Sequence, residues 1–250
     1  FGCNAVGVSG CRIIDSKRER LLAILTNNLV PCNGRFPAII TIITVFFCIG
    51  NGFYSSVISA LILTLVIVFG LCMTFAVTKL LSLTALKGEP SSYTLELPPY
   101  RKPQVGKVIV RSVLDRTLFV LARAVSVAAP AGLVIWLMAN ITVKDVSILN
   151  YLANFLDPLA KLMGLDGIIL IGFILGFPAN EIVIPIIIMG YMGTGCLTEL
   201  SSISQVHSLF VANGWNSITA VSVILFSLLH WPCSTTVLTI KKETGSLKWT

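Results

Sequence analysis

The stretch GIILIGFILGFPANEIVIPIIIMG, residues 167–190, decides how this chain can fold. Its two ends are apolar enough for a bilayer, whereas its centre carries Pro178, Asn180 and Glu181. A proline breaks a helix, and a carboxylate at membrane depth is costly unless it faces a cavity or a pathway. The pattern predicts a discontinuous helix of the kind that transporters use to bind ions near mid-membrane. The alternative is an ordinary helix kinked at Pro178, with Glu181 bonded to a neighbouring helix.

The composition places this stretch in a membrane protein. The chain has 250 residues, of which 55% are hydrophobic and only 12% are charged, against about 25% charged in soluble domains. No Asp, Glu, Lys or Arg occurs in residues 36–78, 124–143 or 200–240. Because one span needs roughly 20 apolar residues, the first gap can hold two spans. We expect an all-α, polytopic helical membrane protein whose main partner is the lipid bilayer.

The positive charges indicate which ends face the cytoplasm. Of 18 Lys and Arg residues, five lie in 12–35, seven in 79–116 and three in 241–248. These segments are short and flank apolar runs, as cytoplasmic loops do. No aromatic residues are interleaved with a basic face, so the net charge of +7 gives no reason to expect a nucleic-acid partner.

These patterns divide one membrane domain into four parts. We expect a first gate half-helix with a cytoplasmic amphipathic helix (1–35, the helix at 12–25), two transmembrane helices (36–80, spans 36–50 and 55–78), a cytoplasmic linker with a second amphipathic helix (81–117), and a second gate region (118–250). The last part would hold a transmembrane helix at 118–139, a hairpin at 167–191 and a helix broken at HWPC, residues 230–233.

A count of membrane crossings favours a re-entrant hairpin at 167–191. Residues 144–166 hold two Lys against three Asp and lack the cytoplasmic signature. If 167–191 simply crossed, Lys241 and Lys242 would lie outside, against their charge. Two half-helices of about ten residues, hinged at FPAN (177–180), resolve the conflict. An extra crossing hidden in 192–214 is the alternative.

Metal-binding side chains occur at three places. His230 and Cys233 are three residues apart at a proline, and an imidazole and a thiol suit a borderline-soft divalent metal. Cys3, Asn4 and Cys11 lie among small residues at the start of the chain. Cys3 precedes Arg12 by nine residues and Cys233 precedes Lys242 by nine, which suggests a degenerate internal repeat.

Other features argue against a secreted disulfide-rich protein and against an enzyme. The seven cysteines are scattered and do not form a secreted disulfide framework. Cys32 lies at the inner mouth before residue 36, and Cys48, Cys72 and Cys196 are expected to be packing residues. Because the sequence lacks the phosphate-binding loop, the HExxH motif, the nucleophile elbow and the dinucleotide-binding fingerprint, we expect no enzymatic site.

Three segments resemble one family. FGCNAVGVSGCRIIDSKRERLLAIL (1–25), ELPPYRKP (96–103) and PCSTTVLTIKKETGSLKW (232–249) are similar, in this order, to segments of ferrous iron transport protein B. The likeness extends over essentially the whole chain. The resemblance implies a bacterial inner-membrane, multi-pass protein that moves Fe²⁺ into the cell.

The resemblance also implies partners. Family members couple the membrane domain to an N-terminal cytoplasmic GTPase domain that binds GTP and Mg²⁺. On this basis the chain would be a fragment without that domain, without the preceding helix and without a last helix. GTP binding would bias the gate through the basic helices at 12–25 and 105–117. A small cytoplasmic accessory protein and a second copy of the chain are further partners that the resemblance allows.

The family pattern places metal-handling cysteines at Cys3 and Cys233. Two departures occur: Ala5-Val6-Gly7 stands where Val-Pro-Ala is usual, and Asn180 precedes Glu181 where a lysine is frequent. Without that lysine, Glu181 would attract a cation more strongly. The predicted ligands of the transported Fe²⁺ are Cys3, Asn4, Asn180, Glu181 and Cys233, with His230 and Cys11 as further candidates. The competing hypotheses are a nucleoside or other small-solute transporter and a membrane scaffold for GTPase signalling.

Overall fold

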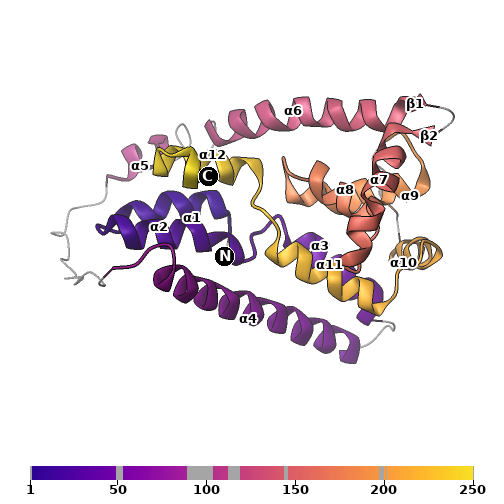
Figure 1. The fold of residues 1–250 in the computed structure, drawn as a ribbon, viewed down its shortest axis with the longest axis horizontal. Coiled ribbons are helices and arrows are strands. Elements are labelled where there is room, and N and C mark those ends of the chain that lie inside the picture. The colour runs from indigo at the N-terminus through magenta and orange to yellow at the C-terminus, as the bar shows by residue number, and fades with distance from the viewer. Residues whose placement is uncertain are drawn as a thin grey trace.

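The computed structural model of the chain describes residues 2–48, 53–88, 104–111, 119–143, 146–196, 200 and 202–249. Its regular structure is helical except for two short strands, β1 (Thr142–Val143) and β2 (Val146–Ser147), which pair antiparallel. The predicted all-α fold is therefore confirmed. Two long helices, α4 (Phe53–Leu83) and α6 (Phe119–Asn140), flank the shorter ones on opposite sides (Figure 1).

The helix α4 shows that this fold needs a bilayer. Within its stretch Tyr54–Leu83, a window of 18 residues has a mean hydropathy of 2.7, yet only 11% of that window is buried by the rest of the chain. A helix that is apolar all round is stable only when it is surrounded by protein or lipid. Among the described residues, Ser217–Thr244 is the second stretch long and apolar enough to cross a membrane. A third exists if the pair Ile148–Leu162 and Gly167–Leu175, bent by 106°, counts as one span.

The segment 167–191 forms a helical hairpin, as the sequence predicts. Its arms are α8 (Gly167–Leu175) and α9 (Val183–Met192), which pack antiparallel. Three glycines lie at the contact: Gly190 faces Ile168, Gly172 faces Ile187, and Gly176 faces Val183. Small residues four apart, such as Gly172 and Gly176, let helix backbones approach closely. The tip contains a turn of 3-10 helix at Asn180–Ile182.

The final apolar run is broken, also as predicted. It consists of α11 (Ser217–Leu229) and α12 (Ser234–Thr244), separated by His230–Cys233. Similarly, α2 (Lys17–Thr26) and α3 (Phe36–Phe47) are separated by residues 27–35. The predicted amphipathic helix at 12–25 is thus found from Lys17, where Ser16 accepts a hydrogen bond from the Glu19 backbone N–H.

Two details differ from the prediction, and a third lies partly outside the described residues. The first span was expected at 36–50, but α3 has 12 residues and is roughly 18 Å long, too short to cross alone. Two helices were not foreseen: α7 (Ile148–Leu162) and α10 (Ile203–Ala212). In the predicted helix at 105–117, α5 (Val105–Arg111) is described. Residues 112–118 and most of the linker, 89–103, lie outside the described residues.

The basic segments gather at one end of the molecule. The Arg18 Nε donates to the Leu86 carbonyl oxygen at 2.5 Å, which joins α2 to the end of α4. Arg12 forms an ion pair with Glu243 at the end of α12, and α1 (Asn4–Gly10) packs along α12. In Figure 1 these elements lie at the α5 end, opposite the β1–β2 end. This arrangement agrees with one cytoplasmic side.

The core lies between the hairpin, α3, α10 and α11. Its most buried side chains are Ile39, Ile42, Phe173, Ile187, Phe210 and Leu228. Most of α3 and both arms of the hairpin are thereby held against α11 and α10. The hairpin tip and the breaks of the other helices are consequently fixed near the middle of the molecule (Figure 1).

The glycine contacts predict a specific failure of the hairpin. In the Gly172→Leu variant, a side chain must enter where a β-carbon would lie 2.7 Å from Ile187. Such overpacking costs about 1–3 kcal/mol, so we expect a lower unfolding temperature in detergent. The control is Gly132→Leu on α6, where a β-carbon meets nothing within 4 Å. Equal unfolding temperatures for the two variants would contradict this packing.

Candidate functional site

Four interruptions of helical structure meet in the middle of the fold. They are the start of α1, residues 27–35, the hairpin tip and residues 230–233. The Asn33 N–H donates to the Gly2 carbonyl at 2.8 Å, and the Ser234 N–H donates to the Phe177 carbonyl at 2.9 Å. These bonds join interruptions that are far apart in the sequence. We call the place where the four interruptions meet the junction.

Arg35 is the central donor of this junction. It precedes α3, and only 1% of its surface is exposed. Its Nη1 donates to the Asn28 and Leu228 carbonyls, both at 2.8 Å. Its Nη2 donates to the Asn28 Oδ1 and to the carbonyls of His230 and Trp231, at 3.0, 2.9 and 3.2 Å. Within the described residues, its Nε is buried without a partner. The guanidinium therefore satisfies carbonyls that the end of α11 leaves free.

Asn180 lies at the centre of the junction and contacts two potential metal ligands. It is buried, and its Oδ1 lies 3.4 Å from the His230 Nε2. Its Nδ2 lies 3.8 Å from the Cys32 Sγ. An amide, an imidazole and a thiol from three separate segments are thus brought together.

The surroundings of His230 determine which ring nitrogen is available. Its Nδ1 lies 2.8 Å from the Ser227 carbonyl and 3.1 Å from the Phe226 carbonyl. Since carbonyl oxygens only accept, Nδ1 carries the proton and the neutral ring presents its Nε2 lone pair toward the Asn180 Oδ1. Both atoms are acceptors, so no proton joins them and their lone pairs face the same point. A backbone carbonyl on one ring nitrogen is the usual way to orient a metal-binding histidine.

Asn4 and Asn28 extend the junction toward α1. The Asn4 Nδ2 donates to the Asn28 Oδ1 at 3.5 Å, and the Asn28 Nδ2 donates to the His230 carbonyl at 2.8 Å. Asn27 donates to the Asn4 carbonyl at 2.9 Å. Asn4, a predicted ligand, thus lies in the same hydrogen-bond network as Arg35 and His230.

Cys3 and Cys233 occupy equivalent local positions. Each is the extended residue immediately before a helix, α1 and α12 respectively. Cys3 is exposed, whereas Cys233 is half-buried with its Sγ 3.3 Å from the Thr236 Oγ1. The two helices pack side by side and end together at the Arg12–Glu243 ion pair. Both cysteines therefore lie at the junction end of this pair.

Glu181 lies at the edge of the junction. Its side chain is exposed and packs over Gly34, where a β-carbon would lie 3.5 Å from the Glu181 Oε1. Among the described residues it makes no hydrogen bond or ion pair.

Cys11 lies apart from the other predicted ligands. It follows the C-terminal end of α1, roughly 12 Å along the helix axis from Cys3. Its thiol donates to the Gly7 carbonyl at 3.3 Å. Burial, reinforced by the charge of Glu243, raises the pKa of the Cys11 thiol. Cys11 therefore cannot share an ion with Cys3.

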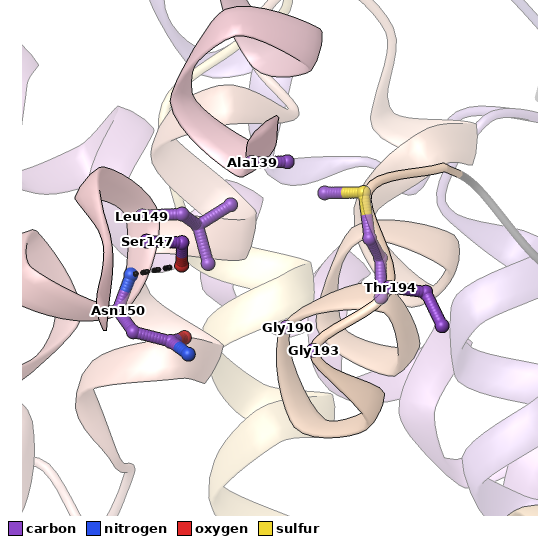
Figure 2. A pocket seen from close by; sticks show the side chains of 8 residues that line it. Ala139, Ser147, Leu149, Asn150, Gly190, Gly193 and Thr194 are labelled. Atoms are coloured by element: carbon purple, nitrogen blue, oxygen red, sulfur yellow. Dashed lines mark hydrogen bonds between the residues drawn. The ribbon is translucent and has the colours of Figure 1, made fainter. Parts of the chain in front are cut away.

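The described residues contain no group of three His, Cys, Asp or Glu side chains close enough to hold a metal ion. The junction instead offers mixed ligands, including amides. A small cavity between the β1–β2 end and α9, lined by Ser147, Asn150 and Thr194 among others (Figure 2), measures about 10 Å³. This is room for about one water molecule, so it is no candidate for a solute site.

Three residues of the junction were not among the predicted ligands: Cys32, Arg35 and Asn28. One signal could have found Cys32. Pro31-Cys32 interrupts α2 and α3, just as Pro232-Cys233 interrupts α11 and α12. The two Pro-Cys pairs are alike both in sequence and in their position between two helices. The predicted repeat instead paired Cys3 with Cys233, only because each lies nine residues before a basic residue.

Family models match two parts of the chain. The model described as nucleoside recognition, Gate, matches residues 121–247, and the model described as ferrous iron transport protein B C terminus matches residues 63–115. The first covers half of the chain and contains the hairpin, His230 and Cys233. No solved structure matches the chain.

Curated relatives match over the full length of the chain. The chain is 28% identical over 262 residues to the Fe(2+) transporter FeoB of Staphylococcus aureus strain COL. It is 27% identical over 263 residues to that of Methanocaldococcus jannaschii, and 26% identical over 270 residues to that of Leptospira interrogans. These matches cover 100%, 100% and 99% of the chain. The chain spans only 36–38% of the length of these relatives.

The Arg35 contacts predict a large loss of stability on substitution. Arg35→Met leaves several carbonyls without a donor, which costs about 1–3 kcal/mol for each buried group. We expect a fall in unfolding temperature in detergent, and a smaller fall for Arg35→Lys, because an ammonium lacks the planar fork of donors. Lys79→Met is the control, since it also removes one cation but its side chain is exposed on α4. A control that unfolds as early as Arg35→Met would contradict the central role of Arg35.

The environment of Cys11 predicts slow alkylation. A raised pKa leaves less thiolate at neutral pH, so the rate of reaction with iodoacetamide should rise only at higher pH than for an ordinary thiol. Glu243→Gln removes the negative charge and should shift the rate profile of a variant with Cys11 as sole cysteine toward lower pH. An unchanged profile would show that Glu243 does not act on this thiol.

Proposed function

Because this chain belongs to the ferrous iron transport protein B family, we propose that it forms the membrane pathway through which Fe²⁺ enters the cell. The observation that carries the proposal is the position of Asn180. Its buried amide lies within reach of both the His230 imidazole and the Cys32 thiol, where helix interruptions converge. Transporters bind ions at such interruptions.

The donor set suits a borderline divalent ion that must leave again. Imidazole nitrogen, thiol sulfur and amide oxygen together fit Fe²⁺ better than Mg²⁺ or Ca²⁺, which prefer oxygen ligands alone. Transport requires modest binding at several sites in succession. Asn180, His230 and Cys32 would form the central site, with Cys3, Asn4, Glu181 and Cys233 as neighbouring ligands.

The contacts of Asn180 suggest where an ion would bind. In the described conformation its Nδ2 donates to the Cys32 Sγ, and its Oδ1 lies 3.4 Å from the unprotonated His230 Nε2. An arriving cation would take the Oδ1 and the Nε2 lone pair as ligands, since both atoms only accept. The ion would relieve the repulsion between these two lone pairs without breaking a hydrogen bond between them.

The membrane arrangement follows the charges. We place the basic end, with α2, α5 and the end of α12, in the cytoplasm of a multi-pass inner-membrane protein, with the α8–α9 hairpin re-entering from outside. An N-terminal GTPase domain with GTP and Mg²⁺ would act on α2 and α5. This part of the protein would carry out no covalent chemistry. An accessory protein and self-association are further interactions that the family suggests.

A nucleoside is the second candidate for the transported solute. The description of the matching Gate model, nucleoside recognition, favours it, and buried Asn side chains suit sugar hydroxyls. The whole-chain relatives are named as Fe(2+) transporters. We therefore rank iron first and include uridine in the test.

Uptake into proteoliposomes tests the proposal. We expect Asn180→Leu, Cys32→Ala and Cys233→Ala to lower Fe²⁺ uptake roughly tenfold or more, since each removes a ligand or its orientation. Cys72→Ala, on the exposed face of α4, is the matched control and should transport normally. Glu181→Gln should also reduce uptake.

Two results would contradict the iron pathway. If the ligand variants take up Fe²⁺ at the wild-type rate while uridine competes, the solute is a nucleoside. If Glu181→Gln and Cys233→Ala leave both metal flux and metal binding unchanged, the chain acts as a scaffold and no ion passes through it.

A further inference from the structure

A second site lies at the basic end of the molecule, away from Asn180. A pocket of 310 Å³ opens between α2 and the C-terminal end of α12. Its walls include Lys17 and Arg20 from α2, Glu243 from α12, and Trp249. We call this the basic pocket. Its volume is at the lower end of the range of small-molecule sites in proteins.

The basic pocket is lined by two cations, and Glu243 in its wall lies close enough to feel the charge of Arg20. Lys17 and Arg20 are three residues apart on one helix, so both project to the same side of α2. Within the described residues, neither side chain makes a hydrogen bond or an ion pair. The one carboxylate in the wall, Glu243, already accepts two hydrogen bonds from Arg12, at 2.7 and 2.5 Å. The pocket therefore has a positive field and free donors, which suit a phosphate group.

The remaining walls are apolar and aromatic. Leu21 and Ile24 of α2 contribute to the lining, and Ile24 is fully buried in a small cluster with Val8 and Ile240. Trp249 is half-buried, and indole rings favour the level of lipid headgroups. A soluble phosphate would need none of these apolar surfaces, whereas a phospholipid presents a phosphate attached to apolar chains.

The position of the pocket brings it close to lipid. The helix α2 packs against α4, whose apolar surface the chain leaves almost entirely uncovered. Lys17 also lies in the first turn of α2, where the backbone N–H groups favour an anion. The same end of the molecule collects the basic segments, which marks the cytoplasmic headgroup level (Figure 1).

We propose that the basic pocket binds the phosphate of an acidic membrane phospholipid through Lys17 and Arg20. The bound headgroup joins α2 to the C-terminal end of α12. Both helices extend from the pocket to the junction around Asn180, α2 through Asn27 and Asn28, and α12 from Cys233. The lipid therefore stabilises the contact between α2 and α12 at the cytoplasmic end, and these two helices support the junction.

Native mass spectrometry of the purified protein tests the proposal, with phosphatidylglycerol and phosphatidylcholine as probes. The wild type should retain phosphatidylglycerol preferentially. The double variant Lys17→Gln/Arg20→Gln should bind it roughly tenfold or more weakly, because each cation near the headgroup contributes to anionic lipid binding. The matched control is Lys79→Gln/Lys87→Gln, which removes the same charge from the same end and should stay within about twofold of the wild type.

Three results would overturn the proposal. They are equal retention of the two lipids, an equal loss of binding in both double variants, and full displacement of phosphatidylglycerol by inorganic phosphate at the same concentration. Both double variants should unfold at the wild-type temperature in neutral detergent. Should the pocket variant fail to fold, the single variant Lys17→Gln, with its exposed side chain, gives the same comparison with Lys79→Gln. Iron uptake is not part of this test, so its result is independent of the transport proposal.

Discussion

The junction depends on one buried guanidinium and the carbonyls it satisfies. A helix that stops inside a membrane leaves carbonyl groups without donors, and no bulk water is available to replace them. Arg35 supplies donors in a fixed planar fork, and the carbonyls of Asn28, Leu228, His230 and Trp231 accept them. These carbonyls belong to two different helix breaks. The guanidinium therefore satisfies the free carbonyls of both helix breaks at once and holds the two breaks together, which a smaller or more flexible cation could not do.

The outer end of the hairpin is fixed by a separate polar chain. Asp166 accepts a hydrogen bond from the Ile169 N–H at 2.7 Å and another from the Tyr191 hydroxyl, while the Trp215 Nε1 donates to that same hydroxyl at 2.6 Å. Because Asp166 begins α8 and Tyr191 belongs to the end of α9, the two arms are joined at their base. The tip is held by different contacts: the Ser234 N–H donates to the Phe177 carbonyl at 2.9 Å, and the Asn180 Nδ2 lies 3.8 Å from the Cys32 Sγ.

The sequence predicted the parts of this architecture that depend on local chemistry. Pro178 predicts the break between α8 and α9, because a proline is visible along the chain. The sequence also predicts Asn180 and His230 as ligands, since both lie close to prolines in apolar runs, and these ligand roles stay predictions. The sequence does not point to the contacts of Arg35 and Cys32, since their partners lie 193 and 148 residues away and Arg35 looks like an ordinary topology charge.

The ligand set around Asn180 is mixed and weak, and the need for reversible binding explains why. A site of three or four thiolates and imidazoles would hold Fe²⁺ tightly, and an ion that cannot leave cannot be transported. In the described conformation the His230 Nδ1 and the Asn180 Nδ2 donate to partners within the protein, whereas the His230 Nε2 and the Asn180 Oδ1 face each other as two acceptors. These two atoms offer a cation one nitrogen and one oxygen rather than a complete ligand shell. The small number of ligands at the central site therefore keeps the binding of a passing cation reversible.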